Sequence, residues 1–175
     1  MKQIDRRTVL QSGAAVLGSG LVMTTSAQHA VGQYFGQSYI EENVAPENMN
    51  DVLRWADQAL LAVRDQGLTP PGASRVLGIG FMAGFAAMNG IRNRYSDSLG
   101  FGRGPENADA LAAYHVAIET TLSGTMGRSF RGTRGRMLAR IPDGEAKSMG
   151  MRWGKHVGQK IQARRARDGA EPTKS

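Results

Sequence analysis

Cysteine is absent from this chain of 175 residues, so disulfides, thiolate metal sites and a cysteine nucleophile are excluded within it. A nucleophilic elbow is also missing, and the histidines have no identifiable carboxylates that would orient them in a Ser-His-Asp set. The glycine-rich stretch Gly100–Pro105 follows neither nucleotide-binding fingerprint, which favours a flexible connection. The sequence therefore assigns no catalytic residue and no cofactor site.

Long apolar runs are also scarce. The stretch Gly13–Met23 is short and rich in glycine and alanine, which is too weak for a membrane-spanning helix of ~20 apolar residues. It follows a twin-arginine pattern at Asp5–Leu10 and precedes the small residues Thr25–Ala27. We therefore predict that residues 1–27 are a twin-arginine export signal cleaved after Ala27, and that the mature protein is periplasmic or extracellular with no transmembrane segment. The alternative is an ordinary arginine pair in front of a buried helix.

The remainder of the chain is typical of one all-α domain. Hydrophobic residues make up 41% of the sequence, and the length suits a single core. Residues 28–48 show neither helical nor strand periodicity, so we expect a linker or packed arm there. A helical domain is predicted over residues 49–169, as a bundle of about four to five helices, with a disordered tail over residues 170–175.

Helical spacing of apolar residues predicts the individual helices. The first begins at a cap formed by Asn50 or Asp51 and ends at Gly67. The second, Pro70–Ile91, is apolar nearly all round, so we expect it to be a buried central helix that the others wrap. The third spans about residues 106–123 and is closed by Gly124, and the last is capped by Asp143.

Charge is distributed unevenly along the chain. Residues 31–125 hold 6 basic and 10 acidic residues, whereas residues 126–175 hold 13 basic and 4 acidic ones. Residues 126–140 stay undecided between helix and loop, because three glycines there each weaken a helix by ~1 kcal/mol. A solvated face is the simplest interpretation of the basic third, and without interleaved aromatic residues we do not expect a nucleic-acid partner. A polyanion site would consist of Arg128, Arg131, Arg134, Arg136, Arg164 and Arg165.

Glycines recur at every fourth position of the last helix, at Gly150, Gly154 and Gly158. Together they weaken this helix by on the order of 3 kcal/mol relative to alanine, and close approach of another backbone would offset this loss. Suitable small residues occur in the second helix: Gly80, Gly84 and Ala87. We predict that the glycine row and the adjacent Trp153 dock a protein partner or a second copy of the chain.

One pair of side chains has metal-ligand or acid-base spacing. His115 and Glu119 lie four residues apart, which places them on one face of a helix. They supply two ligands, whereas a zinc or iron site needs about three from the protein. The sequence therefore favours a structural histidine and leaves a metal site as the alternative.

Over roughly Asp51–Gly169, the order of several residues resembles the N-terminal helical half of bacterial vanadium-dependent haloperoxidases, in the phosphatidic acid phosphatase type 2 superfamily. The resemblance implies an all-helical fold that packs against a C-terminal bundle. Phe81 and Ala86 depart from it, because the family offers a histidine and an aspartate there. The residues that carry it are Trp55, Pro70-Pro71, Arg75, Leu77, Ala83, Asn89, Ile91, Ile141–Gly144, Ala146-Lys147, Gly150, Gly154, Val157, Ile161, Arg164 or Arg165, and Asp168-Gly169.

The family's catalytic segments cannot be carried over to this chain. The resemblance implies that a lysine with an Arg-Pro pair, a Pro-Ser-Gly-His segment and a Ser-Arg segment followed by a histidine hold vanadate or phosphate, and this chain has neither Arg-Pro nor Pro-Ser-Gly-His. We expect an exported, non-catalytic helical protein that docks a protein partner or forms a homo-oligomer. One alternative is half of a split haloperoxidase or acid phosphatase, with vanadate bound only if a partner chain supplies the site. The other is a basic polyanion-binding module.

Overall fold

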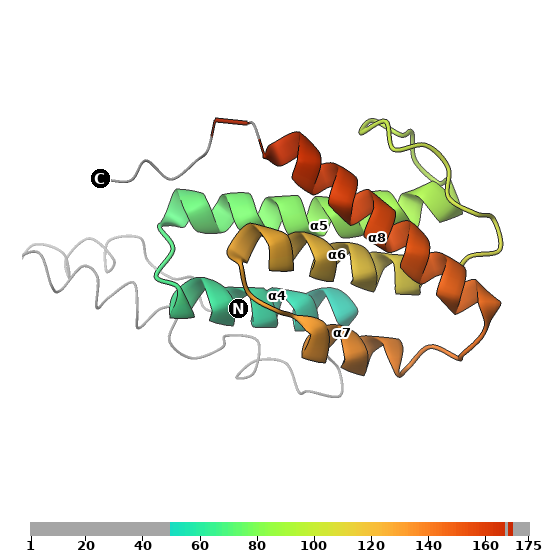
Figure 1. The fold of residues 1–175 in the computed structure, drawn as a ribbon, viewed down its shortest axis with the longest axis horizontal. Coiled ribbons are helices and arrows are strands. Elements are labelled where there is room, and N and C mark those ends of the chain that lie inside the picture. The colour runs from blue at the N-terminus through green and yellow to red at the C-terminus, as the bar shows by residue number, and fades with distance from the viewer. Residues whose placement is uncertain (1–49, 167, 170–175) are drawn as a thin grey trace, which may run out of the picture. The chain divides into compact units, whose positions relative to one another are not determined.

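The structure is a computed structural model that describes residues 50–166, 168 and 169, and these residues form five helices and no strand (Figure 1). The helices are α4 (Asp51–Asp65), α5 (Pro70–Arg92), α6 (Ala110–Met126), α7 (Arg131–Leu138) and α8 (Glu145–Arg165). The predicted all-α bundle of four to five helices is confirmed. The predicted export signal, the arm over residues 28–48 and the tail over residues 170–175 lie outside the described residues.

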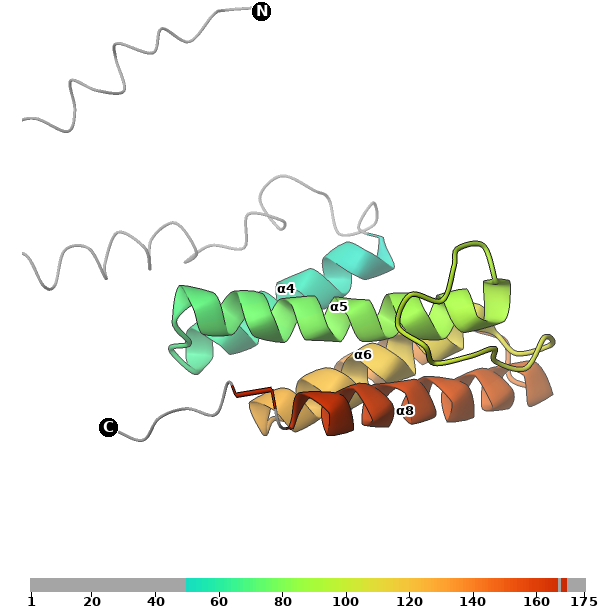
Figure 2. The same cartoon turned by 90° about the horizontal axis from the view of Figure 1, so that it is seen from above.

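α6 is the most enclosed of the five helices. Twelve of its 17 residues are buried, and it contributes side chains to each of the three core clusters. α5 and α8 pack against it in one cluster, and α4, α5 and α7 in another. Figure 1 shows α6 between α5 and α8 on one side and α4 and α7 on the other, and Figure 2 shows the same bundle from above α5.

The expectation that Pro70–Ile91 forms the central buried helix is therefore wrong. α5 buries its small residues against α6 and leaves Met82 and Phe85 41% and 46% exposed. Alanines such as Ala113 and Ala117 on α6, both fully buried, let neighbouring helices approach that helix closely. Neither α5 nor any other helix in the described part of the chain is long and apolar enough to cross a membrane.

α5 meets α6 through two glycines. A Cβ atom on Gly80 would lie 2.7 Å from Cδ2 of Leu122, and one on Gly84 would lie 2.7 Å from Cγ1 of Ile118. Side chains of α6 thus fill the space above these glycines. Because Gly80 and Gly84 of α5 face α6, they are not the small residues against which the glycine row of α8 packs.

Helix starts follow the predicted chemistry only in part. Asn50 caps α4 as expected, since its Oδ1 accepts a hydrogen bond of 3.0 Å from the amide of Leu53. α6 begins at Ala110, four residues later than predicted, because Asp109 accepts a 2.7 Å bond from the amide of Ala112. Asp143 does not cap α8: it binds Nζ of Lys147 at 2.7 Å, and this ammonium group lowers the pKa of the carboxyl group.

Helix ends show a similar difference. Gly124 lies inside α6, and the helix ends instead at Gly127, whose φ of 60° is left-handed and favours glycine. The undecided residues 126–140 contain α7, a helix of eight residues. Its three nearby glycines do not prevent it from forming, because Met137 and Leu138 are buried.

The connection between α5 and α6 is packed onto the helices. The carboxylate of Asp97 accepts hydrogen bonds from the amides of Phe101 (3.2 Å) and Gly102 (2.7 Å), and chiefly the bond from Gly102 lowers its pKa. Phe101 is buried, and the guanidinium group of Arg164 lies 4.4 Å from the centre of its ring. The stretch expected to be a flexible connection is therefore anchored to α8 by an aromatic residue.

Candidate functional site

His115 lies in a buried polar network between α6 and α4. Trp55 donates from Nε1 to Nδ1 of His115 over 3.0 Å, so the ring proton of the neutral imidazole is on Nε2. Nε2 lies 3.4 Å from Oδ2 of Asp51, and Arg140 binds the other oxygen of that carboxylate. Both ring nitrogens of His115 are thus occupied by protein groups, which is the arrangement of a structural histidine.

Burial lowers the pKa of His115, against an opposing effect of the Asp51 carboxylate, which favours the charged form. The neighbouring Tyr114 is also buried, and burial raises the pKa of its phenol to about 12. The Tyr114 and His115 rings meet edge to face with centroids 5.4 Å apart. At neutral pH the pair is therefore uncharged and packs as part of the core.

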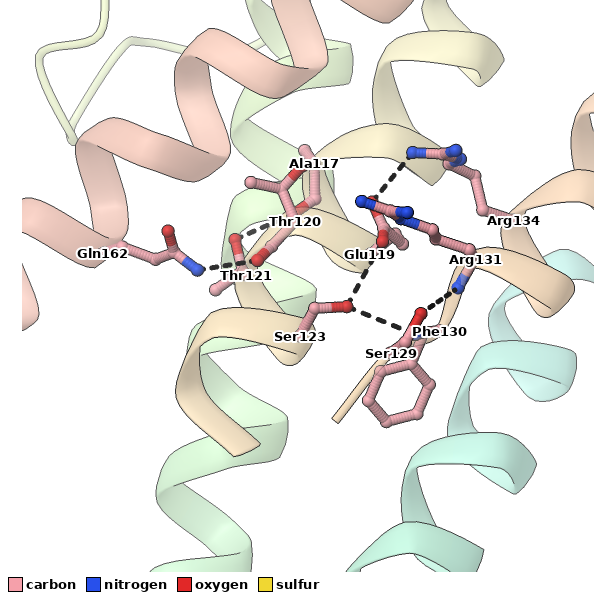
Figure 3. A network of polar contacts seen from close by, with 10 residues as sticks. All are labelled: Ala117, Glu119, Thr120, Thr121, Ser123, Ser129, Phe130, Arg131, Arg134 and Gln162. Carbon is pink, nitrogen blue, oxygen red and sulfur yellow. Dashed lines mark hydrogen bonds and ion pairs between the residues drawn. The ribbon is translucent and has the colours of Figure 1, made fainter. Parts of the chain in front are cut away.

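Glu119 belongs to a different network, which connects α6 to α7 (Figure 3). Nη1 of Arg134 lies 3.1 Å from Oε2 of Glu119, and the hydroxyl of Ser123 donates to Oε1 over 3.2 Å. The same hydroxyl accepts a hydrogen bond of 3.3 Å from the amide of Phe130 just before α7. Glu119 is 6% exposed, so this network stabilises the position of α7 from within the bundle.

The metal alternative for His115 and Glu119 is not supported by their surroundings. Although four residues apart on α6, the two side chains bind different helices, His115 towards α4 and Glu119 towards α7. Across the described part of the chain, no group of three or more histidine, aspartate or glutamate residues could hold a metal ion.

The glycine row of α8 packs against α6 of the same chain. A Cβ atom on Gly150 or Gly154 would lie 2.2 Å from the carbonyl oxygen of Asp109 or Ala113, respectively. One on Gly158 would lie 2.9 Å from Cβ of Thr120. The predicted close approach of another backbone is confirmed, but the prediction that this row docks a partner is wrong, because α6 already occupies it.

Trp153 is likewise engaged within the chain. Its Nε1 donates a hydrogen bond of 2.9 Å to the carbonyl oxygen of Ala87. A Cβ atom on Gly90 or on Gly104 would lie 2.8 Å from an atom of the Trp153 ring. Gly90 and Gly104 are also joined by a backbone hydrogen bond of 2.9 Å. Trp153 therefore seals the end of the α5–α8 contact, and its predicted role in docking is corrected in the same way.

The predicted polyanion arginines do not form one patch. Arg128 pairs with Asp65 at 2.8 Å, and Arg134 pairs with buried Glu119. Arg136 donates from Nη2 to Oγ1 of Thr133, whereas Arg131 has an exposed side chain. All four belong to α7 or the turn before it.

The other two arginines lie at the C-terminal end of α8. Arg164 stacks on Phe101 and donates to the carbonyl oxygen of Leu99, and Arg165 lies 3.8 Å from Oδ2 of Asp168. Figure 1 places this end of α8 and α7 on opposite sides of α5 and α6. The six arginines thus form two separate groups, and the side chains of five of them contact groups of the protein.

An ion pair between Arg75 and Asp168 connects the start of α5 to the residues that follow α8. Arg75 near the start of α5 binds both carboxylate oxygens of Asp168, at 2.9 and 2.8 Å. It also donates to the carbonyl oxygen of Arg165, over 3.4 Å. The positive charge of Arg75 is therefore balanced at the C-terminal end of α8.

The clearest candidate for a functional surface is the outer face of α5. Met82 and Phe85 are exposed there, and the Phe85 ring lies 5.7 Å from the ring of Tyr95, which is 65% exposed. Phe81 and Met88 flank them and pack partly on the core. Figure 2 looks onto α5 from a side that no other described helix covers.

The α5 stretch of this face carries no charge. No ionisable residue occurs between Arg75 and Arg92, a stretch of 16 residues. Helical spacing alone did not reveal this surface, because it predicts burial for every apolar side of Pro70–Ile91. The available signal was residue size: Gly80, Ala83 and Gly84 lie on the side that α6 can approach, and the large residues lie opposite.

Two hollows open on the surface, and Phe85 lines the first of them. One of about 250 Å³ lies between the C-terminal part of α5 and the following loop, lined in part by Asn89, Asp97 and Arg103. Another of about 280 Å³ lies between α4 and α7, lined in part by Arg136 and Phe130. Neither hollow is lined by His115 or Glu119.

No protein-family model, curated protein or solved structure matches the chain.

Proposed function

We propose that this chain is an exported, non-catalytic assembly subunit that docks a protein partner through the outer face of α5. The single observation that carries the proposal is the exposure of Met82 and Phe85 on an uncharged helix face. Exposed apolar side chains grouped on one element are typical of protein interaction sites. Burial of Phe85 and Tyr95 in an interface would supply the aromatic anchors on which such sites depend.

The interior of the bundle supports a scaffold role. Trp55, His115 and Asp51 on one side of α6, and Glu119 and Arg134 on the other, use their polar groups to connect helices. Docking would then rest on a rigid element, because α5 is anchored to α6 through Gly80 and Gly84.

The twin-arginine signal and the resemblance to the helical half of a vanadium-dependent haloperoxidase belong to the same proposal. Both rest on residue order in the sequence. The resemblance implies that these helices pack against a C-terminal bundle, and in this proposal such a bundle, on a partner chain, covers α5. If that partner carried vanadate-binding residues, mixing the two chains would produce vanadate-dependent bromination. Bromination by neither chain alone nor by the mixture would contradict the split-enzyme version.

A matched pair of variants tests the docking proposal. Phe85→Ser changes the α5 face, and Leu111→Ser changes a residue of similar exposure (37%) on α6. We expect the full chain to associate with itself or with a protein of its native extract, the Phe85→Ser variant to lose this association, and the Leu111→Ser variant to keep it. A wild-type chain that stays monomeric and binds nothing, or equal behaviour of the two variants, would contradict the proposal.

A further inference from the structure

We propose that the hollow between α4 and α7 binds the phosphate group of a small phosphorylated molecule. This hollow of about 280 Å³ is lined by Leu61 and Arg64 of α4, and by Arg128, Thr133 and Arg136 of α7 and the turn before it. None of its lining residues belongs to α5. The inference therefore goes beyond the proposed docking function and does not depend on it.

Positive charge predominates among the side chains that line this hollow. Three arginines, Arg64, Arg128 and Arg136, occur there with one carboxylate among the described residues, that of Asp65. Arg128 binds Asp65 at 2.8 Å, but the two side chains are 44% and 48% exposed, and water weakens the attraction within such a pair. The Arg128 guanidinium group can therefore exchange this carboxylate for a ligand oxyanion at little cost.

Arg136 brings a charge to the hollow that no carboxylate in the described part of the chain neutralises. Its Nη2 donates to Oγ1 of Thr133 over 3.2 Å, and it forms no ion pair with any described residue. Thr133 is 6% exposed and in turn donates to Oε1 of Gln58 over 3.3 Å. A buried hydroxyl thus fixes the position of Arg136, and the remaining N–H groups of its guanidinium are available to a ligand.

The donors at this hollow match a tetrahedral oxyanion. A guanidinium group presents a planar fork of N–H donors to oxyanions, and Arg128 and Arg136 provide two such forks. Ser129 adds a hydroxyl: its Oγ accepts a bond of 3.4 Å from the amide of Arg131, so its own proton can be donated to a ligand. A phosphate group has three acceptor oxygens and nearly two negative charges, and it uses more of these donors than a carboxylate can.

The size of the hollow limits the rest of the ligand. Sites for drug-sized ligands enclose about 300–1,000 Å³, so a hollow of about 280 Å³ suits a small molecule. Leu61 and Phe130 supply apolar side chains to its wall, against which a short organic group can lie. The ligand class that fits is a phosphate monoester of a small organic molecule.

Calorimetric titration of the full chain with inorganic phosphate and with glycerol phosphate, at an ionic strength of about 0.15 M, tests the site. We expect one-to-one binding whose dissociation constant rises about tenfold or more in Arg136→Gln. Arg152→Gln is the matched control, because it removes the same charge from an exposed residue of α8 outside the hollow. It should change the constant by less than about twofold, since salt screens distant exposed charges. A wild-type chain without saturable binding, or equal losses in the two variants, would overturn the inference.

Removal of the carboxylate gives a prediction of opposite sign. Asp65→Asn takes away the negative charge in the lining and frees Arg128, so phosphate should bind about threefold more tightly or better. Asp143→Asn makes the same change of charge at an exposed residue before α8, and should alter binding by less than about twofold. A gain of affinity cannot result from misfolding, so this variant tests the site even if Arg136→Gln is unstable. Unchanged or weaker binding in Asp65→Asn would contradict the site.

Vesicles decide whether the phosphate group comes from a free molecule or from a lipid. Phosphatidylcholine vesicles that contain phosphatidic acid present the same group on a membrane surface. We expect glycerol phosphate to bind in solution, and the vesicles to retain the wild-type chain no better than Arg136→Gln. Retention that depends on Arg136, without binding of inorganic phosphate or glycerol phosphate in solution, would overturn the assignment of a small ligand.

Discussion

The α6–α8 contact and the outer face of α5 both contain glycine in a helix, and they use it in opposite ways. In α8, Gly150 and Gly154 allow the carbonyl oxygens of Asp109, the N-cap of α6, and Ala113 to come within 2.2 Å of the place where a Cβ atom would be. On α5, Gly78 has open space above it and two large exposed neighbours, Met82 and Phe85. Glycine thus permits close packing of two helices in α8, whereas Gly78 on α5 is exposed to solvent.

The comparison shows why glycine spacing alone does not identify a docking face. A glycine row means that some backbone or side chain comes close, and the tertiary structure decides whether it comes from the same chain. In α8 the close neighbour is α6. On α5 the position remains open, and the large residues around it stay in contact with solvent.

The largest effect is expected from filling the closed glycine row. Gly154→Ala should destabilise the bundle by about 2 kcal/mol, because the new Cβ atom meets the Ala113 carbonyl and the backbone must shift, despite the better helix propensity of alanine. Gly78→Ala should stabilise it by up to about 1 kcal/mol. Urea unfolding at concentrations where the chain is monomeric measures both. If Gly154→Ala and Gly78→Ala had equal free energies of unfolding, the claim that Gly154 is closely packed and Gly78 is open would be contradicted.

A similar loss is expected at the buried ion pair between α6 and α7. Glu119→Ala should cost about 2 kcal/mol, since it leaves the guanidinium group of Arg134 and the hydroxyl of Ser123 without their acceptor. The exposed pair of Arg128 and Asp65 is the control, and Asp65→Asn should cost less than about 1 kcal/mol. Thermal unfolding compares the two. A larger loss for Asp65→Asn would contradict the role assigned to Glu119.

A smaller effect is expected from acid acting on His115. Its pKa is lowered in the folded state, so between the folded value and the unfolded value of about 6.5 the unfolded chain binds a proton that the folded chain does not. Stability should therefore fall as the pH drops below about 6.5. Protonation at Nδ1 would also break the hydrogen bond from Trp55.

Urea midpoints between pH 7.5 and 5.5 measure this slope, a range chosen because carboxyl groups contribute little there. The charged groups that act on His115 are Asp51, Asp109 and Arg140. His115→Gln should flatten the slope while these groups remain. A wild-type chain that becomes more stable in acid, or an unchanged slope in the variant, would show that His115 is not the responsible group.

The smallest effect is expected on the open face. Met82→Ser should change the stability of the monomer by no more than about 0.5 kcal/mol, because the side chain is 41% exposed. Denaturant titration of the dilute chain measures it, with Leu122→Ser in the fully buried part of α6 as the contrasting variant. A large loss for Met82→Ser would mean that the outer face of α5 belongs to the core.

The helices themselves could be predicted because their signals are local. Apolar residues at helical spacing located α4, α5 and α8, and Asn50 was correctly identified as a cap. Two other helix starts were predicted wrongly. Asp143 forms an ion pair with Lys147 and does not cap α8, and Asp109, which was not predicted as a cap, caps α6. These choices depend on which contacts the folded chain makes, and the residue type does not reveal them.

The functional surface could not be predicted for the same reason. α5 and α6 are both apolar on most sides, and only packing shows that α6 is covered and α5 is partly open. The size difference between the Gly80–Gly84 side and the Phe85 side indicated which side helices approach. The spacing of Gly150, Gly154 and Gly158 predicted a close contact correctly, but it did not identify α6 as the helix in contact.

Methionine methyl NMR tests the claim that α5 has an open face and α6 a closed core most directly. Met82 is exposed on α5, whereas Met126 and Met137 are 7% and 5% exposed in the core cluster. As the full chain is concentrated, we predict that the methyl signal of Met82 shifts while those of Met126 and Met137 stay unchanged. A Met82 signal that does not depend on concentration, or core signals that shift as much as it does, would contradict the claim.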